Sequence, residues 1–134
     1  MTDQTKDNAL EVVLAMLESW DRFDWAAVLD LMSPDCVWHT VMTDPATPPI
    51  VGREAIAAHI AVIAEGLESM RCETIGAAAA GEVVFVERMD AFDFKGNHGD
   101  VPVVGAFRVH DGLVHEWREY FDQQSLLQRM GVNP

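Results

Sequence analysis

Three charged residues lie on strand-like stretches whose other positions on the same face are mostly apolar. Polarity alternates along residues 84–94, and because side chains on a strand point to opposite faces in turn, Arg88 and Asp90 share one face with apolar residues. The same alternation over residues 113–121 places Glu119 on a second largely apolar face. Its companions there are Leu113, His115, Trp117 and Phe121. An uncompensated buried charge is costly, so we expect the two faces to meet in one pocket that contains all three charges.

Two carboxylates held by one arginine suit acid–base catalysis. Two close carboxylates in an apolar cavity do not both ionise readily, so the pKa of one rises while that of the other stays low. The protonated group can donate to a leaving oxygen, the ionised group can take a proton from water, and the arginine orients both. The same spacing also fits a buried ion-pair cluster without a catalytic role, or charges that face solvent at strand ends.

Aromatic residues and histidines supply candidate walls for this pocket. Phe92, Phe107 and Trp117 are assigned to it, and His115 shares a strand face with Trp117. His59 lies beside the apolar stripe of an expected helix and can reach the pocket from there. A hydrogen-bonded wall residue is the more common role for such histidines. Their spacing matches no metal-ligand pattern, so we expect no metal site.

The composition indicates a single folded domain over residues 1–134. The chain is 49% hydrophobic, which is enough for a core of its own. Its net charge of −13 disfavours nucleic acids and anionic membranes as partners. The two cysteines, Cys36 and Cys72, form no disulfide framework. The N-terminal residues lack the apolar core of a signal peptide and no apolar run is long enough to span a membrane, so we expect a cytoplasmic protein.

The remaining pattern predicts the elements that position these residues. Helical or alternating spacing indicates helices over 8–22, 25–32, 53–66 and 123–130, and strands over 36–41, 70–78, 82–94, 101–110 and 113–121. Lys95-Gly96-Asn97 and Asp111-Gly112 predict tight hairpin turns. Helices followed by hairpin-connected strands indicate an α+β fold. We expect one curved, mixed or antiparallel sheet, a cone whose N-terminal helices close an internal apolar pocket.

Several motifs carry a resemblance to a known family. Glu87-Arg88-Met89-Asp90 is followed by Gly105-Ala106-Phe107 and by the run D-G-L-V-H-E-W-R-E-Y-F-D over residues 111–122. Together they resemble the limonene-1,2-epoxide hydrolase family. That family belongs to the nuclear-transport-factor-2-like superfamily of cone-shaped domains, with ketosteroid isomerases and SnoaL-like polyketide cyclases. Residues 52–56, G-R-E-A-I, match the wider superfamily, so the resemblance spans nearly the whole chain.

The resemblance implies an enzyme that opens a small or medium-sized hydrophobic epoxide to a diol in one step, with no cofactor. Asp90 would be the general acid on the epoxide oxygen, and Arg88 would bridge the two carboxylates. Glu119 would stand in the place of the water-activating aspartate of the family, and its side chain is one methylene longer. The resemblance also implies a homodimer formed through the exposed side of the sheet.

Two further positions depart from the family. Trp38 and Thr40 stand where a tyrosine and an asparagine help to hold the water. An indole N–H can only donate a hydrogen bond, whereas a threonine hydroxyl can donate and accept. Because the tryptophan fits a reaction that needs no water, two alternatives stay open. One is an isomerase, cyclase or dehydratase acting on a hydrophobic, steroid- or polyketide-like substrate, and the other is a non-catalytic domain that binds an apolar ligand.

Overall fold

The computed structural model describes residues 2–132 and has four helices and six strands within that range. The helices are α1 (Thr2–Asp21), α2 (Trp25–Asp30), α3 (Arg53–Gly66) and α4 (Gln123–Arg129). The strands are β1 (Met32–His39), β2 (Ile50–Val51), β3 (Leu67–Ala80), β4 (Val83–Phe94), β5 (Asn97–His110) and β6 (Leu113–Tyr120). Every predicted helix and strand has a counterpart, and β2 is an addition.

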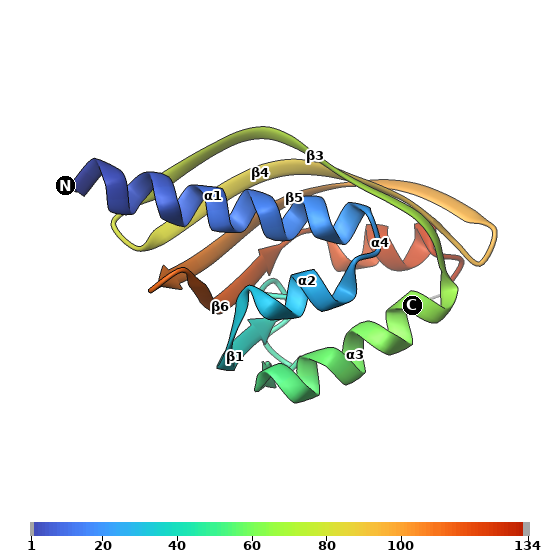
Figure 1. Cartoon of the computed structure of the whole chain (residues 1–134). Coiled ribbons are helices and arrows are strands. Elements are labelled where there is room, and N and C mark those ends of the chain that lie inside the picture. The colour runs from blue at the N-terminus through green and yellow to red at the C-terminus, as the bar shows by residue number, and fades with distance from the viewer. Residues whose placement is uncertain (1, 133–134) are drawn as a thin grey trace.

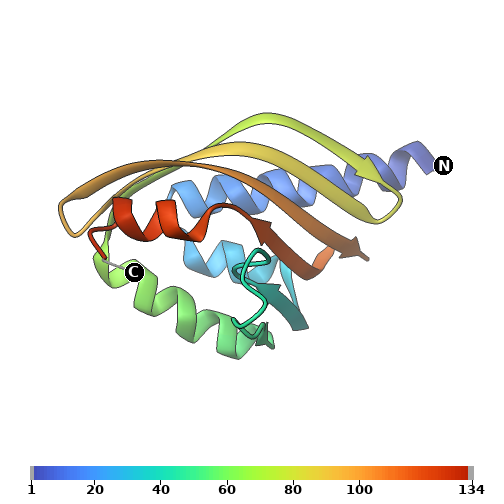
Figure 2. The same cartoon turned by 180° about the vertical axis from the view of Figure 1, so that it is seen from behind.

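All six strands form one curved sheet. The strand order is β2-β1-β6-β5-β4-β3, with β1 parallel to β6 and every other neighbouring pair antiparallel. The helices lie on the concave side, where α1, α2 and α3 pass beneath the arch of the long strands (Figure 1). Seen from behind, α4 lies along the same side, under β5 (Figure 2). The predicted α+β cone is therefore confirmed.

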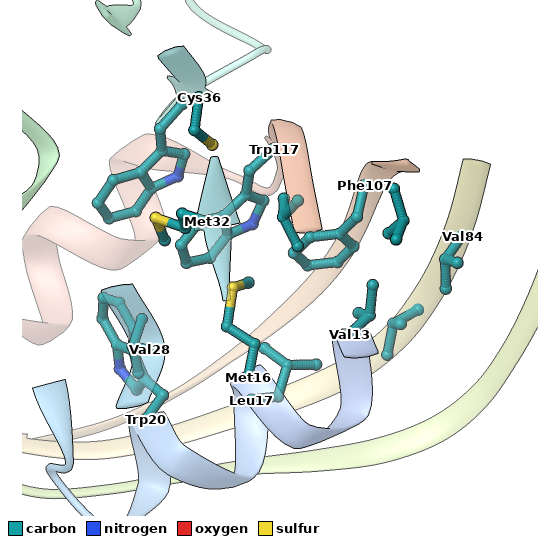
Figure 3. Close-up of a cluster of buried hydrophobic side chains, with 14 of the residues drawn as sticks. Val13, Met16, Leu17, Trp20, Val28, Met32, Cys36, Val84, Phe107 and Trp117 are labelled. Atoms are coloured by element: carbon teal, nitrogen blue, oxygen red, sulfur yellow. The ribbon is translucent and has the colours of Figure 1, made fainter. Parts of the chain in front are cut away.

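The core lies between α1 and the concave face of the sheet. Val13, Met16 and Leu17 of α1 point toward Phe107 and Trp117, and all five side chains are buried (Figure 3). Fully burying an apolar side chain of this size contributes about 1.5–3 kcal/mol of transfer free energy. This packing holds α1 across the strands that carry the charged residues.

Two tight turns fix the register of the three strands at the candidate site. In the β4–β5 turn, Lys95 and Gly96 have φ angles of 48° and 83°. In the β5–β6 turn, Asp111 and Gly112 have φ angles of 51° and 76°. Two successive positive φ angles are typical of the type I′ turn, whose twist matches that of the flanking strands. The hairpins predicted at both places are thus confirmed.

A β-bulge on β6 changes which of its residues face the core. The pairing of β6 with β5 shifts between Arg108 and Val109, and His115 is the extra residue. Val114 is therefore fully buried, while His115 is not. The expectation that His115 shares the inner face with Trp117 is wrong, because strict alternation fails at a bulge.

Several element boundaries also differ from the predictions, among them those of β3 and β5, which were expected over 70–78 and 101–110. Helix α1 begins at Thr2 rather than near residue 8, and β1 begins at Met32 rather than at residue 36. β1 also ends at His39, so Thr40 follows the strand instead of lying within it. In the described part of the chain, no helix is long and apolar enough to cross a membrane.

Candidate active site

Arg88, Asp90 and Glu119 lie together on the concave face of the sheet. They are 3%, 9% and 6% exposed. On β4, burial alternates without interruption from Val84 to Phe92, so Arg88 and Asp90 both point inward. Glu119 comes from β6 and reaches the same place over the intervening strand β5. The juxtaposition predicted from the sequence is therefore present in the structure.

The guanidinium of Arg88 binds both carboxylates through paired hydrogen bonds. Its Nε donates to Asp90 Oδ1 at 2.7 Å, and its Nη2 donates to Asp90 Oδ2 at 3.0 Å. Nη1 donates to Glu119 Oε2 at 3.1 Å, and Nη2 also donates to Glu119 Oε1. All four carboxylate oxygens thus accept from one guanidinium, whose planar fork suits such bidentate contacts.

Burial and mutual charge set the proton affinities within this cluster. Burial raises the pKa of Glu119, the charge of Arg88 opposes that increase, and the charge of Asp90 adds to it. Burial acts to lower the pKa of Arg88, but the two carboxylates outweigh it and raise that pKa well above its ordinary value. Arg88 therefore stays charged, while Glu119 holds a proton more readily than an exposed glutamate does.

A cavity of about 410 Å³ opens against the three charged residues. Most of its remaining wall is apolar and comes from α3, α4 and strands β3 to β5. Lining residues of this kind include Ile63, Met70, Phe92, Val101, Val103, Leu126 and Met130. The carboxylates therefore face a space that suits a small, largely apolar molecule, as most small-molecule sites do.

Four residues predicted to border the site do line the cavity: Trp38, Thr40, His59 and Phe92. Trp38 stacks on the buried Trp117, with ring centroids 4.3 Å apart, and meets His59 edge-on at 5.4 Å. Burial lowers the pKa of His59, so this imidazole is neutral near pH 7. A neutral imidazole offers one donor and one acceptor to a bound molecule.

The other three predicted pocket residues, Phe107, Trp117 and His115, do not line this cavity. Phe107 and Trp117 are core residues, with ring centroids 5.5 Å apart. His115, displaced by the bulge, donates from Nε2 to the carbonyl of His110 at 3.2 Å, and its Nδ1 lies 3.8 Å from Asp35. These positions are corrections to the sequence prediction. The bulge on β6 displaces His115, whereas Phe107 of β5 and Trp117 of β6 face inward but pack in the core beside α1.

Two indole N–H groups next to the site are buried without a partner. Trp38 Nε1 and Trp117 Nε1 make no hydrogen bond to any described residue. A buried polar group left unsatisfied costs about 1–3 kcal/mol. Because both nitrogens are buried, neither N–H is open to a molecule in the cavity.

The two cysteines do not add a nucleophile to the site. Cys36 is fully buried, and this burial raises the pKa of its thiol to about 12. Burial also raises the pKa of Cys72. Both thiols therefore stay protonated at neutral pH, and a protonated thiol is a poor nucleophile. Among the residues with described side chains, no three His, Cys, Asp or Glu residues are grouped so that they could hold a metal ion.

Several residues of the site were not singled out from the sequence. Val101 and Val103 follow from alternation on the predicted strand, so a signal for them was present. Leu126 and Met130 have helical spacing, but nothing in the sequence says that α4 covers the cavity. Gly105 belongs to the Gly105-Ala106-Phe107 motif, but its place on β5 between Arg88 and Glu119 is not evident from the sequence.

Comparisons with known proteins agree with this architecture. A model of the SnoaL-like domain matches residues 13–117. An LEH-like epoxide hydrolase from M. tuberculosis is 23% identical, with 93% of this chain and 90% of that chain covered and a TM-score of 0.80. A proposed polyketide cyclase from Xanthomonas campestris is 20% identical, with 94% and 98% covered and a TM-score of 0.84.

A third similar structure, from Catenulispora acidiphila, has a ketosteroid isomerase-like fold and was solved in complex with trimethylamine. It is 22% identical, with 91% of this chain and 93% of that chain covered and a TM-score of 0.79. At such identities, these structures share the fold with this chain. Their differing descriptions illustrate that one cone-shaped scaffold hosts several activities.

Proposed function

The chain belongs to the SnoaL-like domain family, and we propose that it is an enzyme that adds water to a small or medium-sized hydrophobic epoxide without a cofactor. The observation that carries this proposal is a pair of carboxylates that share one buried guanidinium at the wall of an apolar cavity. The cavity volume of about 410 Å³ is near the lower end of the range of small-molecule sites. The likeness to an LEH-like epoxide hydrolase supports an epoxide in particular.

The proposed reaction is a single displacement. Glu119 removes a proton from a water molecule while the water oxygen attacks one epoxide carbon. The bond between that carbon and the epoxide oxygen breaks, and the oxygen keeps the electron pair and takes a proton from the carboxylic acid of Asp90. The product is a vicinal diol with one oxygen from water. Return of the proton from Glu119 to Asp90 resets the site.

Arg88 acts on both carboxyl groups in this division of labour. Burial raises the pKa of Glu119 and the cation opposes that increase only in part, so Glu119 acts as a base from its ionised fraction. Because Arg88 also contacts both oxygens of Asp90, it holds the acid and the base on one rigid group. Thr40, whose hydroxyl can donate and accept, is proposed to hold the water, and Trp38 to position the substrate through its ring, since its N–H is buried.

Turnover of a panel of apolar epoxides by the purified protein tests the proposal. Diol should form with the parent protein and should be lost in Asp90→Asn and Glu119→Gln. Glu116→Gln is the matched control, because Glu116 lies on the same strand but contacts His39 and Arg118 instead of the cluster. Its turnover should equal that of the parent. Absence of diol from every epoxide in the panel would contradict the proposal.

A proton-transfer reaction that needs no added water is the second candidate. It is favoured by the raised pKa of Glu119, which suits an acid, and by Trp38, which cannot accept a proton from water. An isomerase, cyclase or dehydratase of a hydrophobic substrate would use the same cavity. Rearranged product without added oxygen would select this candidate. Ligand binding without turnover, unchanged in Asp90→Asn, would instead indicate a binding domain.

We also propose that the chain forms a homodimer through the convex face of the sheet. Phe85, Val104 and Tyr120 are exposed there, on three neighbouring strands. Exposed apolar side chains on neighbouring strands of one sheet face suit contact with a second copy of the chain. Sedimentation velocity should give a dimer for the parent and a monomer for Phe85→Lys. A monomeric parent would contradict this expectation.

A further inference from the structure

The ion pair between Arg88 and Glu119 spans three strands rather than two. Arg88 is on β4 and Glu119 is on β6, with β5 between them. Neighbouring strands are about 4.8 Å apart, so the two backbones are separated by roughly twice that distance. The two side chains must therefore meet directly above β5, where an ordinary inward side chain of β5 would stand.

Gly105 is the β5 residue at this crossing point. It pairs with Glu119 on one side and with Val86 on the other. A Cβ atom built on Gly105 would lie 2.8 Å from Arg88 Nη1, 2.8 Å from Glu119 Oε2 and 2.7 Å from Phe107 Cε1. Cβ contacts shorter than 3.0 Å essentially do not occur in real proteins. Even a methyl group would therefore force the guanidinium, the carboxylate or the core phenylalanine to move.

We propose that Gly105 is a positioning residue whose missing side chain leaves the gap through which Arg88 reaches Glu119. This inference extends the proposed function and rests on it, because it takes Glu119 to be one of the residues that carry out the reaction. The inference also accounts for a glutamate rather than the shorter aspartate at position 119, because the carboxylate of a glutamate extends over β5 into the space that the glycine leaves free. Asp90 does not depend on the gap, since it contacts Arg88 from the same strand.

The substitution Gly105→Ala should separate the two halves of the cluster. A weaker contact with Arg88 would leave the effect of burial on Glu119 less opposed. The pKa of Glu119 should therefore rise further. A base displaced by about 1 Å can cost on the order of 100-fold in rate. We therefore expect kcat to fall by about that factor. KM should change little, because Gly105 does not line the cavity.

The readout that decides the inference is the titration of Glu119, followed by NMR of ¹³C-carboxyl-labelled glutamate. The Glu119 signal is identified by its loss in Glu119→Gln. This measurement needs no substrate, so it tests Gly105 even if no epoxide is turned over and the proposed function fails. The expected result is a higher titration midpoint in Gly105→Ala than in the parent.

Gly76→Ala is the matched control. Gly76 also lies within a strand of the sheet, but a Cβ built there has no atom within 4 Å. Its Glu119 titration and its kcat should equal those of the parent. A Gly105→Ala protein that matches Gly76→Ala in both measurements would overturn the inference.

A second pair of variants keeps the test usable if Gly105→Ala does not fold. Phe107→Leu removes the Cε1 atom that the new methyl group would meet, and Phe107 lies in the core outside the cavity. Glu119 should titrate at a higher pH in Gly105→Ala/Phe107→Leu than in Phe107→Leu alone. Equal midpoints in these two proteins would show that the gap is not needed for the contact.

Discussion

The cavity wall has a charged part, formed by Arg88, Asp90 and Glu119 and called its charged end below, and an apolar part that includes α4 and is called its apolar end; the two are built in different ways. At the charged end, Arg88 satisfies all four carboxylate oxygens of Asp90 and Glu119, so each polar atom has a defined partner and position. At the apolar end, side chains such as Leu126 of α4 only limit the available volume. Directional contacts fix geometry, whereas apolar packing tolerates changes that conserve volume. We therefore expect the charged end to control rate and the apolar end to control substrate choice.

Removal of the shared cation should produce the largest effect. Arg88→Met leaves two carboxylates buried without a partner, and breaking a buried ion pair by removal of one member typically costs about 3–5 kcal/mol. Urea unfolding should show a loss of this size, with no measurable turnover. Arg108→Met, at an exposed position of β5, should be near neutral. Equal stability of Arg88→Met and the parent would mean that the charged end is not a coupled unit.

Neutralisation of the acid should affect turnover more than folding. Asp90→Asn keeps the size of the side chain but cannot supply the proton, and general acid catalysis typically contributes about 10²–10⁴-fold. We expect kcat to fall within that range while the urea midpoint changes far less than in Arg88→Met. A rate close to that of the parent would assign the acid to another group.

A substitution at the apolar end should change substrate binding instead. Leu126→Ala enlarges the cavity, and one or a few methylenes in a hydrophobic pocket are worth about 10-fold or more in discrimination. KM should therefore rise by about 10-fold, with kcat within a few-fold of the parent value. Gln128→Ala, at an exposed position of the same helix, is the control. A fall in kcat without a change in KM would break the distinction between the two ends.

The smallest predicted effect is a pH dependence of stability at the charged end. Because the pKa of Glu119 is raised in the folded state, the folded protein binds this proton more tightly than the unfolded chain does. The resulting stabilisation is complete below the ordinary value of 4.5 and is lost as the pH rises through the raised pKa. Urea unfolding between pH 4 and 8 should show this loss in the parent and in Glu116→Gln, but not in Glu119→Gln. The same pH slope in all three proteins would contradict the prediction.

The charged end was largely predictable because β4 alternates without a bulge between Val83 and Phe94. Because side chains on a regular strand alternate between its two faces, the sequence alone places Arg88 and Asp90 on the inner face, where the structure has them. The same rule failed for His115, since a bulge inserts one residue and reverses the alternation beyond it. Register beyond a bulge depends on pairing with other strands, and a single strand's sequence does not contain that information.

The apolar end was less predictable for a different reason. The spacing of Leu126 and Met130 indicates an apolar helix face, but which surface this face covers depends on the three-dimensional path of α4. Gly105 is a similar case, since its importance comes from two side chains on neighbouring strands. The local sequence pattern predicts which face of its own helix or strand a residue occupies. Contacts between elements depend on how the whole sheet and its helices are assembled.

The most direct test of the proposed mechanism is a single turnover of an apolar epoxide in ¹⁸O-labelled water, with enzyme in excess of substrate. Direct attack by water predicts that the first diol formed already carries one labelled oxygen and that no label enters the protein. An unlabelled first product, with label appearing in a carboxylate of Asp90 or Glu119, would indicate a covalent ester and contradict the acid–base pair. Rearranged product without label would move the assignment to the proton-transfer candidate.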